Sequence, residues 1–386
     1  MFYNGHMFSF LKNKPKEEVT TCVLVVNSYS IVASVVRTYN REDAVAKPVV
    51  LFSCEEKVPH HHIGGTTSLE ALASLAIKKS LEKCRMVHGN YDKIICVVGD
   101  PWIMTKTRHI VIERPTAFRL TQKLVNDAVS RDARLFEQEA LRDYAKEEEW
   151  GIIHNTQPLI DINGYRAENP FGVVTNSAVI HMSFSLAPAS FVEMVMGAYA
   201  DVFHRVDIMF VGTEVLVADF VKEYGRASVI TLGGTSGTLA VFEQGILEFS
   251  ESLYRGLADF EDGVAYLFKV NHSHIGSVVH FASDEKLIEH ERDIYYQRIE
   301  AAYKTIGDEI RMGVLRLKKN VGYMADPVIL IANPGWISAI TPLLEKDIES
   351  SVIIPRKDMF DDRLVYTHEA RVKNIILSLA ILNYAR

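Results

Sequence analysis

The sequence predicts a two-lobed α/β fold with an inserted subdomain. Two segments, residues 21–36 and 228–243, each place β-branched and apolar stretches on either side of a short turn, which is typical of a β-hairpin. Strands and helices alternate after each hairpin. A long excursion at about residues 100–187 separates a strand at 94–98 from a helix at 190–203. A hairpin that recurs at the start of each half indicates two related lobes.

The composition is that of a soluble globular chain. The chain has 386 residues, 48% of them hydrophobic and 24% charged, which is enough for two or three cores. A formal net charge of −7 gives no general attraction to nucleic acid, so no nucleic-acid partner is expected. Four cysteines without a C-x-x-C pair favour a reducing cytoplasm. The apolar run at 375–382 is far shorter than the roughly 20 residues that span a bilayer.

Residues 1–18 are expected to form an N-terminal tail. Phe2, Phe8, Phe10 and Leu11 stand there beside three lysines. Such a peptide favours peripheral membrane contact through residues 1–16, and a disordered tail is the open alternative.

The first lobe is predicted to comprise residues 19–99 and 188–224. After the hairpin and a strand, Thr67-x-x-Glu70 forms a capping box that opens a helix ending near His88. The remaining elements are strands at 47–53, 91–98 and 206–211 and helices at 190–203 and 213–224. A hinge is expected near Tyr224–Arg226, where this lobe ends.

The excursion at 100–187 is predicted to be a β-α-β-β module. It contains a strand at 109–112, a charged helix at about 121–145 and two extended segments at 152–162 and 173–186. Turn residues such as Asn163-Gly164 separate these elements.

The second lobe is predicted to span residues 225–367, with a helical subdomain at about 261–325. Its other elements are a second hairpin that turns at Gln244-Gly245, helices at 257–270, 284–317 and 336–346, and strands at 327–332 and 352–355. A final helix at 368–384, apolar nearly all round, is expected to pack back on the first lobe.

The turn of the second-lobe hairpin reads Gly233-Gly234-Thr235-Ser236-Gly237. Glycine takes the backbone conformations of a tight turn and leaves the amides bare. Converging amides form a concave anion site, so phosphate binding is one interpretation. A tight turn without a ligand is the other.

The duplicated hairpins resemble the plan of the actin/Hsp70/sugar-kinase ATPase fold, with its ribonuclease-H-like halves. Residues 23–36 and 229–242 are similar to its first and second phosphate segments, and residues 328–335 stand where its adenosine motif would be. Within this fold the chain resembles the FtsA and PilM branch, because residues 160–172 are similar to the FtsA-type inserted subdomain. The N-terminal residues 7–14 look more like PilM.

The resemblance implies a nucleotide site between the lobes, with ATP or ADP and Mg²⁺ as its cofactor. The residues that would bind the cofactor are Asn27, Ser28, Ser30, Gly233, Gly234, Thr235, Asn333 and Gly335.

The chain departs from the family at the positions that handle the metal. Asn27, Thr231 and Thr238 stand where carboxylates are expected. A neutral amide supplies no charge to offset Mg²⁺, which prefers carboxylate and phosphate oxygens. Nucleotide binding is therefore expected to be weak or absent, without efficient hydrolysis. Glu214 is the candidate for a water-activating residue, and an ordinary acid in the first turn of a helix is the alternative.

Other chemistry has less support. His60-His61-His62 cannot all face one ion from an ordered backbone, so a solvated loop is expected, and His272, His274 and His280 are discounted likewise. No metal site is predicted. Trp336 could stack on a base or simply pack at a helix start. No Ser/His/Asp or Cys/His arrangement indicates covalent catalysis.

Two classes of function follow. The favoured one is an actin-like scaffold or adaptor that links a membrane-associated division or pilus-type assembly to cytoplasmic partners. It would contact proteins through the inserted subdomain and lobe faces, associate into filaments and lie at the inner face of the cell membrane. The alternative is a functional, filament-forming actin-like ATPase. A sugar-kinase-like enzyme would need an acidic base in the interlobe cleft that the sequence does not identify.

Overall fold

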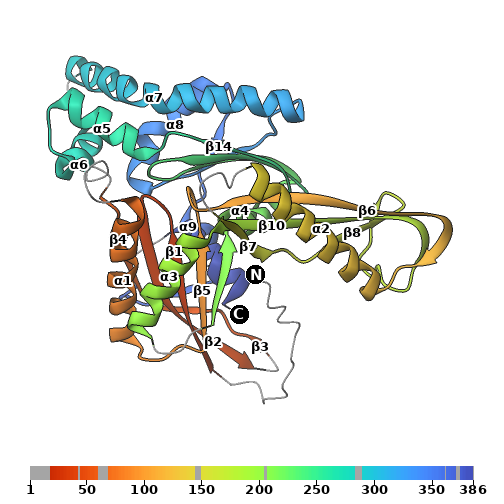
Figure 1. Cartoon of the computed structure of the whole chain (residues 1–386). Helices are drawn as coiled ribbons and strands as arrows, with labels where there is room; N and C mark the ends of the chain where they lie inside the picture. Colours follow the sequence, from red (N-terminus) through yellow and green to blue (C-terminus); the bar gives the residue numbers. More distant parts are fainter. Residues whose placement is uncertain are drawn as a thin grey trace.

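The fold comprises two main lobes and an extension at one side (Figure 1). The computed structural model describes residues 18–41, 44–59, 68–143, 149–203, 207–282, 289–360, 362–370 and 374–385. The predicted α/β class and two-lobed architecture are confirmed. Residues 1–17 of the tail predicted at 1–18, and His60–His62, lie outside the described residues, so the predictions about them stay predictions.

The first lobe is built on a seven-stranded sheet. Its strands are β1 (Glu18–Val26), β2 (Ser30–Arg41), β3 (Ala44–Val45), β4 (Val49–Lys57), β5 (Lys93–Val98), β11 (Ile208–Gly212) and β17 (Val365–Tyr366). They lie in the order β11-β5-β1-β2-β4-β17, and β3 pairs with β2. The hairpin β1–β2 is antiparallel, whereas β5 and β11 continue the sheet in parallel.

The second lobe repeats this arrangement. Its strands are β12 (Arg226–Leu232), β13 (Gly237–Glu243), β14 (Ile246–Leu253), β15 (Val328–Ile331) and β16 (Val352–Ile353). They lie in the order β14-β13-β12-β15-β16, which matches β4-β2-β1-β5-β11 strand for strand. Each lobe therefore begins with a hairpin whose first strand pairs in parallel with the strand that follows later in the chain.

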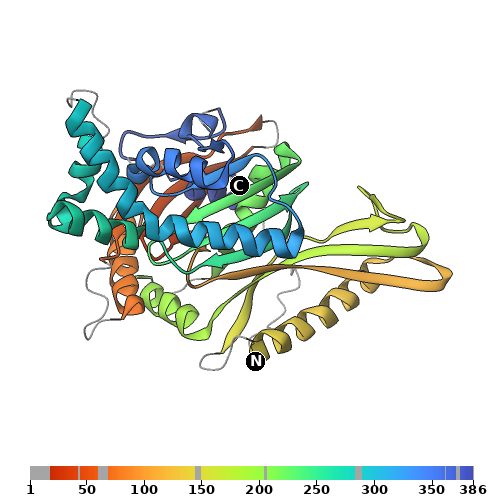
Figure 2. The same cartoon turned by 90° about the horizontal axis from the view of Figure 1, so that it is seen from above.

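Helices cover the outer faces of both sheets (Figures 1 and 2). The first sheet carries α1 (Leu69–Val87) and α3 (Ala189–Val202). The second carries α5 (Leu257–Phe268), α7 (Glu289–Val321) and α8 (Pro334–Ile348), and α6 (Ile275–Ala282) packs against these three helices. The hydroxyl of Ser68 accepts a hydrogen bond from the Ala71 amide and caps α1, one residue after the predicted cap Thr67. The region predicted as one helix at 284–317 corresponds to α7. In the described part of the chain, no helix is both long and apolar enough to cross a membrane.

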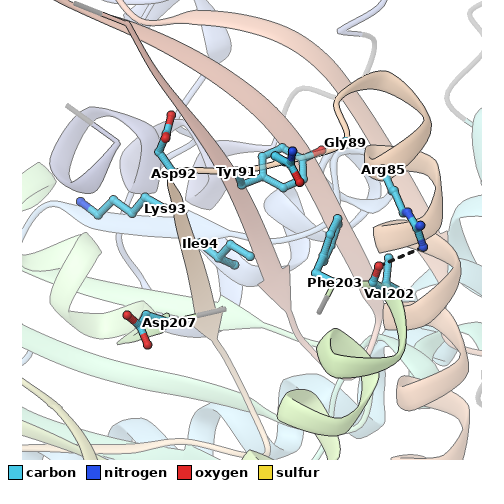
Figure 3. Close-up of a pocket in the computed structure, with 10 residues that line it drawn as sticks. Arg85, Gly89, Tyr91, Asp92, Lys93, Ile94, Val202, Phe203 and Asp207 are labelled. Atoms are coloured by element: carbon cyan, nitrogen blue, oxygen red, sulfur yellow. Dashed lines mark hydrogen bonds between the residues drawn. The ribbon is translucent and has the colours of Figure 1, made fainter. Parts of the chain in front are cut away.

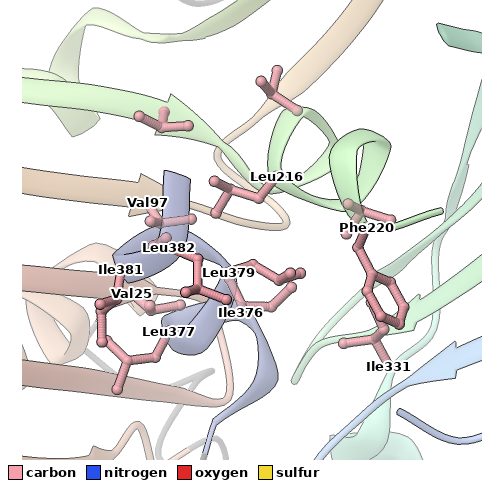
Figure 4. Close-up of a cluster of buried hydrophobic side chains, with 14 of the residues drawn as sticks. Val25, Val97, Leu216, Phe220, Ile331, Ile376, Leu377, Leu379, Ile381 and Leu382 are labelled. Atoms are coloured by element: carbon pink, nitrogen blue, oxygen red, sulfur yellow. The ribbon is translucent and has the colours of Figure 1, made fainter. Parts of the chain in front are cut away.

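Two helices, α4 (Thr213–Val221) and α9 (Ile375–Tyr384), form an apolar core with the inner faces of both sheets (Figure 4). Leu216 and Phe220 of α4 and Leu379 of α9 are buried there. Such burial stabilises by about 1.5–3 kcal/mol per large side chain. Because α9 is buried on nearly all sides, its sequence lacks a polar face.

The final helix is shorter than predicted. It begins at Ile375 and not at 368, and the Asn374 side chain caps it by accepting from the Leu377 amide at 3.0 Å. The preceding β17 pairs with Val49 and Val50 of β4. The backbone of β17, upstream of α9, therefore lies at the edge of the sheet. Its polar groups form hydrogen bonds there with β4 and not within a helix.

The described residues between Met104 and Pro188 form a third sheet and one helix. Its strands are β6 (Met104–Arg119), β7 (Trp150–Asn155), β8 (Leu159–Ile162), β9 (Tyr165–Arg166) and β10 (Val174–Pro188), with α2 (Gln122–Asp143) packed on one face. Among the described residues, none of these strands pairs with a strand of either lobe. The predicted strand at 109–112 is much longer because β10 pairs along almost all of β6.

Candidate functional site

A cavity of about 730 Å³ lies between the lobes, at the ends of the strands that lead into the two hairpin turns. Among the predicted site residues, those that line it are Asn27, Ser30, Gly233, Asn333 and Glu214. Ligands of open α/β sheets bind beyond the carboxyl ends of the strands, which is where this cavity is. It is therefore the candidate site.

The first turn is closed by its own side chain. The Asn27 side-chain oxygen accepts hydrogen bonds from the amides of Tyr29 at 2.8 Å and Ser30 at 2.9 Å. This local pattern is an Asx turn, for which asparagine is well suited. The side-chain oxygen that stands where a carboxylate was expected thus holds the backbone of its own turn.

The second turn is occupied by a residue from the first. The buried hydroxyl of Ser28 accepts hydrogen bonds from the amides of Gly234 and Thr235, both at 3.0 Å. The Gly233 amide donates to the Ser236 carbonyl at 2.9 Å. The structure therefore brings Ser28 and the three predicted cradle residues together, with the Ser28 oxygen at the place where a phosphate oxygen was expected.

Tyr29 crosses from the first lobe into the second. Its side chain is 5% exposed and packs in the core of the second lobe. The hydroxyl donates to Glu261 Oε1 at 2.8 Å and accepts from Trp336 Nε1 at 2.9 Å. Burial first, and then the charge of Glu261, raise the pKa of the Tyr29 phenol, so it stays neutral and can donate.

The strand that resembles an adenosine motif ends in a helix cap. The side-chain oxygen of Asn333 accepts from the Gly335 amide at 2.9 Å and opens α8. Trp336 is buried and meets Phe260 edge to face, with ring centroids 5.9 Å apart. Of the two interpretations of Trp336, stacking on a base and packing at a helix start, packing describes its position in the structure.

Two carboxyl groups are buried beside the turns. Glu214 accepts a hydrogen bond from Thr105 Oγ1 at 2.9 Å, and Asp100 accepts one from the hydroxyl of Thr238. Burial raises the pKa of Asp100 to about 6. Burial first, and then the charge of Asp100, raise the pKa of Glu214 to about 7. Groups with such pKa values near neutrality are typical of proton-transfer sites and also occur in structural clusters.

Sequence reasoning missed Asp100. It lies two residues after the end of the buried strand β5, and its carbonyl accepts from the Ser28 amide at 3.0 Å. Asp100 could have been identified because a polar residue at the carboxyl end of a buried parallel strand often lies at a ligand site.

The arrangement does not fit a triphosphate with Mg²⁺ in this conformation. The amides of Gly234 and Thr235 and the oxygen of Asn27 already have partners within the chain. Among the described residues that line the cavity, Arg356 is the one cation beside three acidic residues, Glu55, Asp100 and Glu214. A single cation leaves most of the charge of a phosphate chain without a basic partner.

A ladder of polar pairs runs from the buried Glu214 along the inserted sheet. Thr105 faces Ser185 with 2.9 Å between their hydroxyl oxygens, and Thr107 faces Ser183 at 2.7 Å. The next pair is His109 and His181. Sequence reasoning did not identify the ladder, although polar residues at alternate positions of both strands were the signal.

A different pocket, of about 650 Å³, lies at the opposite end of β5 (Figure 3). It is lined by Asp92 and Lys93 at the start of that strand, whereas the cleft lies beyond its end at Val98. Arg85 on its rim donates to the Val202 carbonyl at 3.0 Å. This pocket is therefore separate from the two turns.

Of the histidines weighed as metal ligands, His272, His274 and His280 lie in the described part of the chain. His272 Nε2 lies 2.6 Å from an oxygen of Asp262 on the surface of the second lobe. Within the described residues, no group of three or more His, Cys, Asp or Glu side chains is placed to hold a metal ion.

Two lobes that share an order of five strands, two helices between them and an insertion in the first lobe define the actin-like ATPase fold. No family model and no curated protein matches the sequence. Among solved structures, the chain is similar to a chain of the PilM-PilN type IV pilus biogenesis complex, with a TM-score of 0.61, 11% identity and 95% of each chain covered. The predicted actin-like ATPase fold is thereby confirmed.

Two further structures are similar at lower scores. One is a protein from Bacteroides thetaiotaomicron with an actin-like ATPase fold, at 12% identity and a TM-score of 0.43, covering 95% of this chain and 96% of that one. The other is ethanolamine utilization protein EutJ from Carboxydothermus hydrogenoformans, at 11% identity and a TM-score of 0.44, covering 95% and 90%.

Proposed function

We propose that this chain is an actin-like scaffold of the PilM type whose two lobes are held together by side chains and not by a nucleotide. Its role would be to connect a membrane-associated assembly to proteins on the cytoplasmic side. The actin-like ATPase fold suggests nucleotide binding in general. In this chain, binding of ATP or ADP with Mg²⁺ would be weak or absent.

The observation that carries this proposal is the Ser28 hydroxyl on the amides of Gly234 and Thr235. In a working site these donors would face the ligand's phosphate oxygens. In this chain a hydroxyl oxygen from the opposite lobe accepts their hydrogen bonds, so no ligand is needed to satisfy them. Because Tyr29 adds a second bridge to Glu261 and Trp336, closure of the cleft is supported without a cofactor.

The partner is proposed from the fold neighbour. That structure is a complex of PilM with PilN, so a protein partner of the PilN type is the natural candidate. The inserted sheet and the lobe faces offer the contact surface, and contact with the membrane would come from residues 1–16. Liposome flotation of the intact chain against one that starts at Glu17 tests the membrane contact, and equal flotation would exclude it.

The nucleotide part of the proposal is tested by calorimetric titration with ATP, with and without Mg²⁺, together with a phosphate-release assay. We expect no measurable turnover in the wild type. Ser28→Ala frees two backbone amides and should increase affinity for ATP or inorganic pyrophosphate. Ser34→Ala is the matched control, because the Ser34 hydroxyl donates within the first sheet to the Phe52 carbonyl and does not reach the cleft.

Robust turnover of the wild type that Asn27→Ala abolishes would reject the scaffold in favour of a working ATPase. A gain of Mg²⁺-dependent affinity in the double variant Asn27→Asp/Thr231→Asp would instead support a degenerate site. The partner is tested by the genes next to this one and by copurification with any PilN-type product. Failure to copurify with such a product would reject the PilM-type role.

The alternative function, an ATPase, draws on one observation. Asp100 and Glu214 are buried beside the cleft and have pKa values near neutrality, as a general base requires. Glu214→Gln distinguishes the two functions, since it would abolish turnover in an ATPase and leave a scaffold's partner binding unchanged.

A further inference from the structure

We propose that His109 and His181 form a binding site for a divalent transition-metal ion of the Zn²⁺ type on the inserted sheet. The two residues stand directly opposite each other on β6 and β10. Their Nδ1 atoms are 2.8 Å apart, and the rings meet edge to face with centroids 4.9 Å apart. His109 is exposed and the His181 side chain is 14% exposed, so an ion can reach both from solvent.

The two facing Nδ1 atoms can hold only one proton between them. A hydrogen bond between two Nδ1 atoms needs one protonated donor and one bare acceptor. On the other side of its ring, His181 Nε2 lies 2.9 Å from Asp161 Oδ2. When His181 is neutral and its Nε2–H donates a hydrogen bond to that carboxylate, its Nδ1 carries a lone pair directed at His109.

Asp161 is held in place on the far side of the His181 ring, where its second carboxylate oxygen has a partner of its own. Arg166 Nε donates to Asp161 Oδ1 at 2.6 Å. A carboxylate behind a histidine fixes the ring's tautomer and orientation and raises its basicity, as in many zinc sites.

The distances suit an ion after a small adjustment. Zn–N bonds of about 2.0–2.1 Å in a tetrahedral site place two ligand nitrogens roughly 3.3 Å apart. The rings must therefore separate by about half an ångström, which the exposed His109 side chain can accommodate by rotation. Water would complete the coordination, because within the described residues no third His, Cys, Asp or Glu joins the pair. The site would be weak and exchangeable.

Occupancy would connect three strands of the inserted sheet. His109 lies on β6, His181 on β10 and Asp161 on β8. The pair also continues the polar ladder that leads through Thr107 and Ser183 toward Glu214. An ion at this position would stiffen the insertion independently of the cleft, so the inference does not depend on the proposed scaffold function.

Calorimetric titration of the full-length protein with Zn²⁺ tests the site. His60–His62 could take up ions as well, so the readout is the difference between variants. We expect His109→Ala to bind one ion fewer than the wild type, and His280→Ala, an exposed histidine on α6, to bind as many as the wild type. Asp161→Asn keeps both imidazoles and should lower the affinity for that one ion about 10- to 100-fold.

A second measurement identifies the ligands. Electron paramagnetic resonance of bound Cu²⁺ should show coupling to two imidazole nitrogens in the wild type, and this signal should be lost in His109→Ala. Equal stoichiometry and equal affinity in the wild type and His109→Ala would overturn the proposal and leave the two histidines as a hydrogen-bonded pair only.

Discussion

The indole nitrogen of Trp336 donates a hydrogen bond of 2.9 Å to the hydroxyl of Tyr29, a residue 307 positions earlier in the chain. Tyr29 belongs to the turn of the first hairpin, and Trp336 to the first turn of α8. Both side chains are buried, and the same hydroxyl donates to Glu261 on α5. A single phenol therefore anchors the first lobe in the core of the second.

Tyr29→Phe should lower the free energy of unfolding by about 1–3 kcal/mol, because it leaves a buried indole N–H and a largely buried carboxylate without this partner. Urea unfolding followed by tryptophan fluorescence measures the change. Tyr266→Phe is the control, since Tyr266 is 82% exposed and should have almost no effect. Equal midpoints for Tyr29→Phe and wild type would show that the bridge does not stabilise the fold.

The pair Asp100 and Glu214 should make stability fall as the pH rises. Burial raises the pKa of both groups, to about 6 and about 7, from their ordinary values of 3.8 and 4.5. Between about pH 4 and 7 the folded state therefore binds more protons than the unfolded chain, so these groups' contribution is present at low pH and is lost across that window. Above about pH 7 the contribution of these two groups to stability no longer changes with pH.

The measurement is urea unfolding at several pH values for the wild type and for Asp100→Asn/Glu214→Gln. Other groups titrate too, so the expected result concerns the difference between the two proteins. The variant should gain stability relative to the wild type as the pH rises from 4.5 to 7.5. A difference that does not change with pH would contradict the raised pKa values.

Gly256→Ala should destabilise the protein through the second turn. An added Cβ would lie 2.4 Å from the Gly234 carbonyl oxygen and 2.7 Å from the Ser236 amide nitrogen, so the loop that holds the Ser28 hydroxyl would have to move. Gly276→Ala on α6 is the matched control, because nothing lies within 4 Å of its added Cβ and alanine favours a helix by about 1 kcal/mol. Thermal unfolding should shift down for the first variant and not for the second.

Leu379→Ala on α9 should cost about 2–5 kcal/mol, because the side chain is buried between the sheets and its removal leaves a cavity. Leu315→Ala on α7 offers a comparison, since Leu315 is 60% exposed and should lose far less. Denaturant unfolding distinguishes the two variants. Similar losses would mean that α9 is not part of a tightly packed core.

The sequence by itself determined the order of the elements and the duplication of the lobes. The hairpins at 21–36 and 228–243 could be recognised because alternating apolar residues and turn chemistry are local signals. The buried helix α9 could be predicted because its apolar residues surround the axis, although its start could not. That boundary is set by pairing of β17 with β4, which brings together residues more than 300 positions apart.

Only the tertiary structure decided what the candidate site contains. From the sequence, Ser28 and Tyr29 were turn residues, and Gly233, Gly234 and Thr235 were bare amides. In the folded chain the Ser28 hydroxyl occupies two of those amides and Tyr29 is buried in the other lobe. The partners lie more than 200 residues away in the sequence, so no local pattern encodes them. Their meeting depends on how two separately formed lobes close on each other.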